Sequence, residues 1–136
     1  MSTSYSGGCA CGLIRYECSA EPVMSVNCHC RDCQRATGSA YSTDMVVPLS
    51  GWEITSGSVK YFAKTADSGN TVSRGFCAEC GSPLFAKESV APDIIVITAG
   101  SLDDPSRYSP TGDLWTTSAQ PWDHMNPDLE KFETQP

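Results

Sequence analysis

Three short cysteine clusters constrain the fold of this chain more than any other feature of its sequence. They are Cys9-Ala10-Cys11, Cys28-His29-Cys30-Arg31-Asp32-Cys33 and Cys77-Ala78-Glu79-Cys80. A metal ion held by thiolates keeps its ligands within a few ångströms of one another, so the fold has to bring distant segments together. The first and third clusters supply four cysteines between them, whereas the second supplies three.

These numbers predict two kinds of metal site. Zinc with four protein ligands is structural, whereas zinc with three keeps one position open for water or substrate. We therefore expect a closed site made by the first and third clusters and an open site made by the second. Redox-active cysteines are the alternative, but clustered cysteines in a chain whose thiols stay reduced favour metal binding.

Length and charge narrow the functional classes. A chain of 136 residues suits a single domain over 1–136. It has neither an apolar span of ~20 residues nor a secretion signal, so we expect a cytoplasmic protein with no membrane attachment. Its formal net charge of -7 would repel a phosphate backbone, so we expect no nucleic-acid partner.

Short segments rich in β-branched and aromatic residues predict an all-β fold. The expected strands cover residues 13–18, 40–47, 52–55, 59–63, 71–76, 84–87 and 94–99. Helix signals are weak: one short helical turn is expected over 32–36 and another near 127–132. From residue 101 onward, prolines exclude most of the chain from a central strand, while two tryptophans argue against disorder. We expect this tail to be ordered and to wrap over the sheet.

The local geometry of the clusters can also be predicted. Cys9 and Cys11 would point to one face of an extended strand, and Gly81 would let the turn after Cys80 reverse sharply. Cys18 is the one cysteine outside the clusters and hence the candidate fourth ligand of the second site. If the strand that contains Cys18 continued from Cys9, the two side chains would point to opposite faces, because they are an odd number of residues apart. We therefore predict that Cys18 is a small hydrophobic core residue and not a ligand.

Polar residues around the second cluster are candidates for chemistry. His29 lies between two of its cysteines, where either a hydrogen-bonded loop histidine or a catalytic residue fits. Arg31 and Arg35 flank the cluster and could bind a substrate carboxylate or lower the pKa of a thiol, with ordinary surface arginine as the alternative. His124 is a weaker candidate.

Longer motifs surround the clusters. Gly-Gly-Cys-Ala-Cys-Gly covers 7–12, Cys-His-Cys-Arg-Asp-Cys-Gln-Arg covers 28–35, and Arg-Gly-Phe-Cys-Ala-Glu-Cys-Gly-Ser-Pro-Leu-Phe covers 74–85. Gly-Ser-Leu-Asp-Asp-Pro at 100–105 and Pro-Trp at 121–122 follow. In this order, over nearly the whole chain, the motifs resemble the glutathione-dependent formaldehyde-activating enzyme family, which includes centromere protein V.

The resemblance implies a β-tent zinc-binding fold of antiparallel sheets with short helical caps. It also implies two zinc ions, a structural one on Cys9, Cys11, Cys77 and Cys80 and a catalytic one on Cys28, Cys30 and Cys33. The founding activity of the family is that of a carbon–sulfur lyase, which joins formaldehyde to glutathione as S-hydroxymethylglutathione.

We therefore expect a zinc-dependent enzyme that acts on a thiol/aldehyde adduct, with glutathione as the candidate thiol. We expect His29 to be the catalytic residue, and Tyr41 and Asp44 are the alternatives for moving the hydroxyl proton.

Three other functions are alternatives. A non-catalytic zinc-stabilised protein-binding module of the β-tent type would have a permanently closed second site. Methionine sulfoxide reductases resemble this fold, but they need a later nucleophilic cysteine and this chain has none after Cys80. A chromatin-binding role, suggested by centromere protein V, is disfavoured by the net negative charge.

Overall fold

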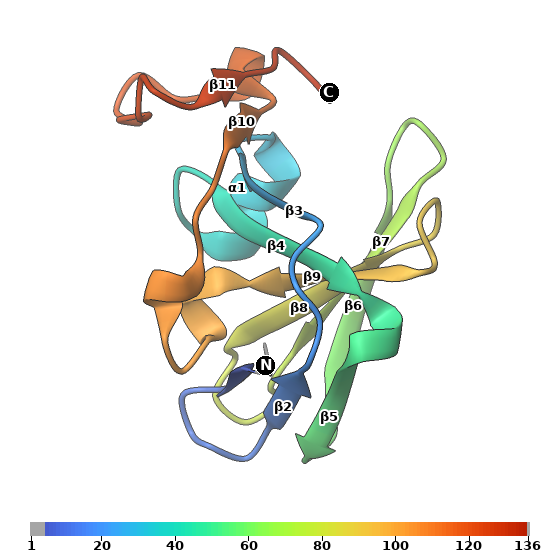
Figure 1. The fold of residues 1–136 in the computed structure, drawn as a ribbon. Helices are drawn as coiled ribbons and strands as arrows, with labels where there is room; N and C mark the ends of the chain where they lie inside the picture. Colours follow the sequence, from blue (N-terminus) through green and yellow to red (C-terminus); the bar gives the residue numbers. More distant parts are fainter. Residues whose placement is uncertain (1–4, 136) are drawn as a thin grey trace.

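Two β-sheets form the framework of the computed structural model, which describes residues 5–135 (Figure 1). The small sheet has the strand order β1-β2-β5 and is antiparallel throughout. Its strands are β1 (Tyr5–Gly8), β2 (Arg15–Cys18) and β5 (Trp52–Ser56).

The large sheet has the order β11-β10-β3-β4-β9-β8-β7-β6. Its strands are β3 (Met24–Cys28), β4 (Ser42–Pro48), β6 (Lys60–Thr65), β7 (Thr71–Phe76), β8 (Pro83–Glu88), β9 (Ile94–Thr98), β10 (Gly112–Leu114) and β11 (Glu130–Lys131).

The helical segments are short. They are α1 (Arg31–Thr37) and the 3-10 turns η1 (Leu49–Gly51), η2 (Ala99–Ser101), η3 (Pro105–Arg107) and η4 (Thr116–Ser118). The expected all-β fold with small helical caps is confirmed. Among residues 5–135, no helix is long and apolar enough to cross a membrane.

The seven expected strands are all present, with each end within two residues of its predicted position. Strands β1 and β3 were not expected. β3 contains Ser25 and Asn27, which have little intrinsic strand preference, and β1 ends in two glycines. Both strands form because they pair with stronger neighbours, β2 and β4 respectively.

The main core lies between the two sheets. Tyr16 and Trp52 project from the small sheet and meet Phe85 and Met45 of the large one. The ring centroids of Trp52 and Phe85 are 4.6 Å apart, and those of Tyr16 and Trp52 are 5.9 Å apart. Burial of these side chains accounts for the alternating pattern from which the strands were predicted.

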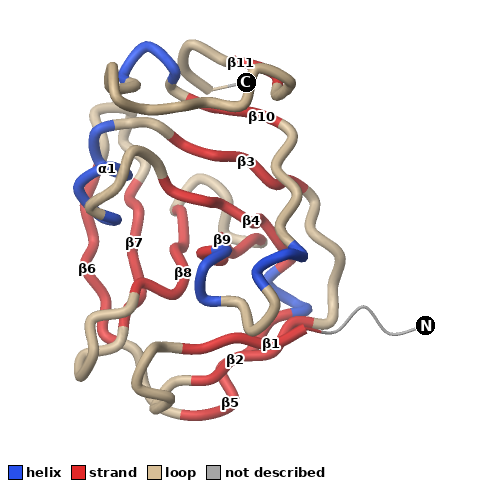
Figure 2. Tube along the Cα trace, turned by 90° about the vertical axis from the view of Figure 1, so that its left-hand side faces the viewer, coloured by secondary structure: helices blue, strands red, loops and turns tan. Residues whose placement is uncertain are grey.

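The tail departs from the expectation in two ways. It is ordered, as predicted, but β10 pairs in parallel with both β3 and β11, so the large sheet is not purely antiparallel. The segment near 127–132 is not helical and contains β11, because Glu130 and Phe132 donate backbone hydrogen bonds to Thr111 and Asp113. In Figure 2, β10 and β11 lie at the end of the molecule opposite the small sheet.

The large sheet packs one face against the core and turns its opposite face towards helix α1; we call this second face the helix face. In β4, Met45 points into the core, so the alternation of side chains places Asp44 on the helix face. In β6, the Lys64 ammonium binds the Asp32 carboxylate of α1 at 2.6 Å. Arg74 of β7 also reaches α1 from this face.

Candidate metal centres

The first cluster gathers four sulfur atoms at the spacing of a tetrahedral thiolate site. The Sγ atoms of Cys9, Cys11, Cys77 and Cys80 lie within 4.8 Å of one another. The Sγ atom of Cys11 is 3.6 Å from that of Cys9 and 3.7 Å from that of Cys77. A tetrahedral site with Zn–S bonds of about 2.3 Å requires sulfur–sulfur distances of roughly 3.8 Å, so the donor set fits zinc.

Two similar turns hold these sulfurs. Gly12 and Gly81 follow the second cysteine of each pair, with φ of 81° and 77°, and their amides donate to the carbonyls of Cys9 and Cys77. The role expected for Gly81 is confirmed. The expectation that Cys9 and Cys11 lie on an extended strand is wrong, because β1 ends at Gly8 and the chain turns there.

The first cluster fastens the two sheets together. One of its turns connects β1 to β2 in the small sheet, and the other connects β7 to β8 in the large sheet. The amide of Ala10 donates to the Ser82 hydroxyl across this junction at 2.9 Å. The Ser82 hydroxyl also binds the Cys80 sulfur at 3.2 Å, which helps lower the pKa of Cys80 to about 5 and so favours its thiolate.

The second cluster lies where β3 passes into α1. Cys28 ends the strand, Cys30 caps the helix and Cys33 lies in its first turn, with the three sulfurs within 4.8 Å of one another. The Cys30 sulfur accepts the backbone N–H of Cys33 at 3.3 Å. The helix predicted over 32–36 is confirmed, and it ends where Gly38 adopts a left-handed conformation.

The second cluster has three ligands, not four. Among the residues that the structure describes, no further Cys, His, Asp or Glu offers an atom within 4.8 Å of all three sulfurs. Cys18 belongs to neither cluster: it is 1% exposed in the core between the sheets, and its thiol faces the Ala20 carbonyl at 3.6 Å. A tetrahedral metal ion bound to these three sulfurs would therefore have one position without a described protein ligand.

The three thiols of this cluster influence one another's protonation. Hydrogen bonds from Cys28 and Cys33 lower the pKa of Cys30 to about 2. The pKa of Cys28, in turn, is raised by its hydrogen bond with Cys30. A metal ion binding all three sulfurs has to displace the remaining protons, so metal affinity should rise with pH.

His29, the expected catalytic residue, is completely buried with both ring nitrogens in hydrogen bonds. Its Nε2 atom lies 2.8 Å from Oδ1 of Asp113, and its Nδ1 atom lies 2.5 Å from Oδ2 of Asp123. Each ring nitrogen thus faces a carboxylate oxygen of the tail, and the two hydrogen bonds fix the orientation of the ring. His29 therefore connects the second cluster to the tail.

This buried network extends on both sides of His29. Burial alone would raise the pKa of Asp113, but hydrogen bonds from Lys131, His29 and Asn27 lower it overall. Gln34 in α1 donates to the carbonyl oxygens of His29 and Ser118 at 2.7 and 3.0 Å. The helix and the tail thus hold the loop carrying Cys28 and Cys30 from two directions.

Arg74, rather than the expected arginines, contacts the second cluster. Its Nη2 atom lies 3.9 Å from the Cys33 sulfur. Arg31 and Arg35 are exposed, and Arg31 donates to the Gln34 side chain. Asp44 lies on the same face, and burial raises its pKa to about 6.

The remaining candidates are less closely placed. The Tyr41 ring lies 5.0 Å from that of His29, and His124 is exposed.

Sequence reasoning missed the acidic partners of His29 because Asp113 and Asp123 are 84 and 94 residues away from it in the chain. Arg74 begins the motif at 74–85, but nothing in its local sequence assigns it a role. The strand pattern did contain its orientation, because 71–76 was predicted as a strand, but not the fact that α1 covers that face.

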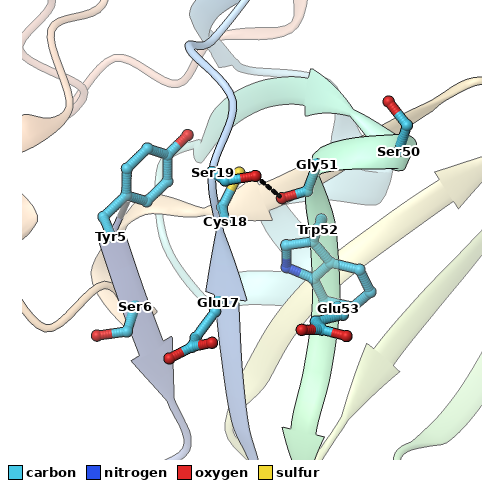
Figure 3. Close-up of a pocket in the computed structure, with 9 residues that line it drawn as sticks. All are labelled: Tyr5, Ser6, Glu17, Cys18, Ser19, Ser50, Gly51, Trp52 and Glu53. Atoms are coloured by element: carbon cyan, nitrogen blue, oxygen red, sulfur yellow. Dashed lines mark hydrogen bonds between the residues drawn. The ribbon is translucent and has the colours of Figure 1, made fainter. Parts of the chain in front are cut away.

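A separate cavity lies over the small sheet, away from the second cluster. It has a volume of about 490 Å³ and is lined by carboxylates and hydroxyl groups, with Cys18 in its wall. Figure 3 shows Glu17 and Glu53 on neighbouring strands β2 and β5. Among the described residues, no Lys, Arg or His lines this cavity, and none of its lining residues belongs to either group of potential metal ligands.

Comparison with known proteins agrees with this architecture. A model of the family described as glutathione-dependent formaldehyde-activating enzyme matches residues 4–118. The crystal structure of a Rhodobacter sphaeroides protein has a similar fold, with a TM-score of 0.61 and 15% sequence identity over 93% of this chain and 98% of that one. No curated protein sequence is significantly similar to the chain. Since the family match covers most of the chain and every clustered cysteine, the protein belongs to the glutathione-dependent formaldehyde-activating enzyme family.

Proposed function

We propose that this protein is a cytoplasmic, zinc-dependent carbon–sulfur lyase that joins a thiol to an aldehyde and cleaves the adduct. S-hydroxymethylglutathione is the model adduct. The observation that carries the proposal is a three-cysteine cluster without a fourth described protein ligand, in a chain of this family. The closed four-cysteine cluster would hold a structural zinc ion.

The donor sets support zinc at both clusters. Soft thiolate ligands select zinc over the harder divalent ions, and the sulfur spacing of the first cluster matches its tetrahedral geometry. Zinc bound at the second cluster would supply an exchangeable position at which a thiol is held as its thiolate. Cys28, Cys30 and Cys33 would hold the ion and so fix where that thiol sits.

The reaction needs no oxidant or reductant. A sulfur lone pair attacks the aldehyde carbon, a C–S bond forms, and the C=O π pair moves to oxygen, which takes up the proton lost by the thiol. Cleavage reverses these steps. Asp44 is a candidate to carry this proton, because it lies on the helix face and its pKa of about 6 lets it both accept and donate near neutral pH.

His29 has a different role in this proposal from the catalytic one expected from the sequence. It is 0% exposed and both ring nitrogens are occupied by carboxylates, so it has no free position from which to exchange a proton with substrate. We assign it the positioning of the Cys28–Cys30 segment. Buried hydrogen-bond partners of this kind keep metal ligands in place.

The test uses the cobalt-substituted protein, because cobalt bound to thiolates absorbs in the visible range. Titration with glutathione should change the spectrum of one of the two metal sites, and formaldehyde exchange into glutathione measured by NMR should accelerate when the protein is added. A protein-binding module with a closed second site would give neither response. That pair of negative results would refute the enzyme assignment.

A further inference from the structure

We propose that Arg74 binds a carboxylate of the thiol substrate, so that the second cluster selects anionic thiols. This inference rests on the proposed function, because it concerns the ligand that occupies the open position. In this proposal, β7 carries no metal ligand but recognises the carboxylate of the substrate, which takes no part in the reaction.

The position of Arg74 suits this role. Its guanidinium reaches across the helix face to within 3.9 Å of the Cys33 sulfur, and the residue is half-buried. A guanidinium has five N–H donors in a planar fork, and a contact through one nitrogen leaves the others available. A thiol held at the second cluster would therefore lie beside a cation that can bind a carboxylate with two parallel hydrogen bonds.

Two lysines near the cluster are already paired with carboxylates, and Arg31 and Arg35 are exposed on the surface of α1. Lys64 pairs with Asp32 and Lys131 pairs with Asp113. Among residues 5–135, no carboxylate comes within 4.0 Å of the Arg74 guanidinium, and this includes Asp44 on the same face. Arg74 is thus a half-buried guanidinium that contacts the Cys33 sulfur. Burial raises the pKa of Asp44, and the charge of Arg74 acts to lower it without an ion pair between the two.

The charge of the protein makes a local cation necessary for such a substrate. The chain carries a formal net charge of -7, and three cysteine thiolates with a bound zinc ion would add one further negative charge at the site. An anionic thiol would be repelled from this surface unless a positive group offsets the repulsion at short range. Arg74 is placed to do so, and arginine binds carboxylates with better geometry than lysine.

The test compares two thiols and three variants of the full-length, cobalt-substituted protein. Glutathione carries carboxylates, whereas 2-mercaptoethanol is neutral. We expect R74M to bind glutathione about 10- to 100-fold more weakly, the loss typical of one charged hydrogen-bonded contact, and 2-mercaptoethanol within about twofold of wild type. R74K should show an intermediate loss for glutathione alone. Arg35, exposed on the same helix as Cys33, gives the matched control R35M, which should bind both thiols normally.

Other outcomes would overturn the proposal. Equal weakening of both thiols by R74M would mean that Arg74 acts on the charge of the cluster and not on a carboxylate. Unchanged glutathione binding would mean that there is no contact. Metal content and melting temperature are measured for each variant. If R74M loses the metal ion of the second cluster, the ratio of glutathione affinity to 2-mercaptoethanol affinity in R74K decides whether the proposal holds. A wild-type protein that responds to neither thiol refutes the proposed function itself, whereas response to 2-mercaptoethanol alone refutes only the selectivity for anionic thiols.

Discussion

The two cysteine clusters differ most in their surroundings. The first joins turns from two different sheets across 66 residues of sequence and leaves Cys11 and Cys80 exposed. The second uses residues 28–33 and is enclosed by α1 and the tail, with Cys28 7% and Cys33 9% exposed. The four-cysteine cluster thus has two buried and two exposed sulfur ligands, whereas none of the three cysteines of the second cluster is fully exposed.

Under the proposed function, sulfur exposure therefore does not separate a structural site from a reactive one. Four thiolates saturate a tetrahedral ion even when two of them are in contact with water. The second cluster differs in its ligand number and in its neighbours, which include a guanidinium, a buried carboxyl group and an imidazole between two carboxylates. Those features require side chains from β4, β7 and the tail.

The largest expected effect comes from Cys77→Ala in the first cluster. Structural zinc contributes about 10–16 kcal/mol in small peptides, which is comparable with the whole stability of a domain, so the variant should not fold stably at 37 °C. Circular dichroism and metal analysis would measure this. Cys18→Ala is the matched control, because Cys18 is buried outside both clusters. It should keep both metal ions and lose about 1 kcal/mol. A folded Cys77→Ala protein would show that the first cluster does not hold the sheets together.

A smaller loss is expected when the buried ion network beside the second cluster is broken. Asp123→Ala removes one carboxylate partner of His29 and should cost about 3–5 kcal/mol of unfolding free energy. It should also weaken metal binding at the second cluster about 10- to 100-fold and leave the first unchanged. Asp128→Ala, an exposed change in the same tail, should do neither. Loss of activity with normal stability and normal metal affinity would instead favour a proton-transfer role for His29.

Removal of a ligand from the second cluster should separate activity from folding. Cys33→Ala should lose one metal ion and all activity, with a cost of only about 1–3 kcal/mol, because the two sheets remain joined by the first cluster. Metal stoichiometry, melting temperature and activity measured on one preparation would check this. Global unfolding of this variant would make the second cluster structural and count against an enzyme.

The smallest effect concerns an exposed ion pair near the first cluster. The Arg15 guanidinium binds Asp103 through both nitrogens and lowers the pKa of Asp103 to about 2. A depressed carboxyl pKa stabilises the fold above the unfolded value of about 3.9 and loses that effect as pH falls towards 2. Both side chains are well exposed, so Asp103→Asn should cost only about 0.5 kcal/mol, equally at pH 5 and pH 7. This cost should shrink in about 1 M salt, since screening is strong there. A loss that salt does not reduce would indicate that Asp103 has another role.

Much of the fold could be predicted because its signals are local. The β-branched and aromatic residues of 71–76 predict that strand with the bounds it has in the structure, and the cysteine clusters predict both groups of sulfur atoms. β3 was missed because Ser25 and Asn27 have little intrinsic strand preference, and its pairing with β10 joins residues 86 positions apart, such as Asn27 and Asp113.

The candidate site was predictable only in its ligands. The spacing of the second cluster identifies its cysteines, Cys28, Cys30 and Cys33, as potential ligands. In contrast, Asp113 and Asp123 lie among glycine and proline residues that suggest turns. Nothing in their local sequence marks them as partners of a buried histidine. Arg31 and Arg35 were expected beside the cluster because they are adjacent to it in sequence. The arginine that contacts it in space is Arg74, from strand β7. Non-local contacts of this kind are set by tertiary packing, which a single sequence pattern does not reveal.

The parallel pairing of β10 with β3 also determines the order in which the molecule can be completed during synthesis. The three sulfurs of the second cluster emerge from the ribosome within six residues, yet the carboxylates that hold His29 follow only at positions 113 and 123. The cluster is therefore synthesised before the tail that encloses it. Selection of the correct metal would then depend on which ion is present when the last strands close over it.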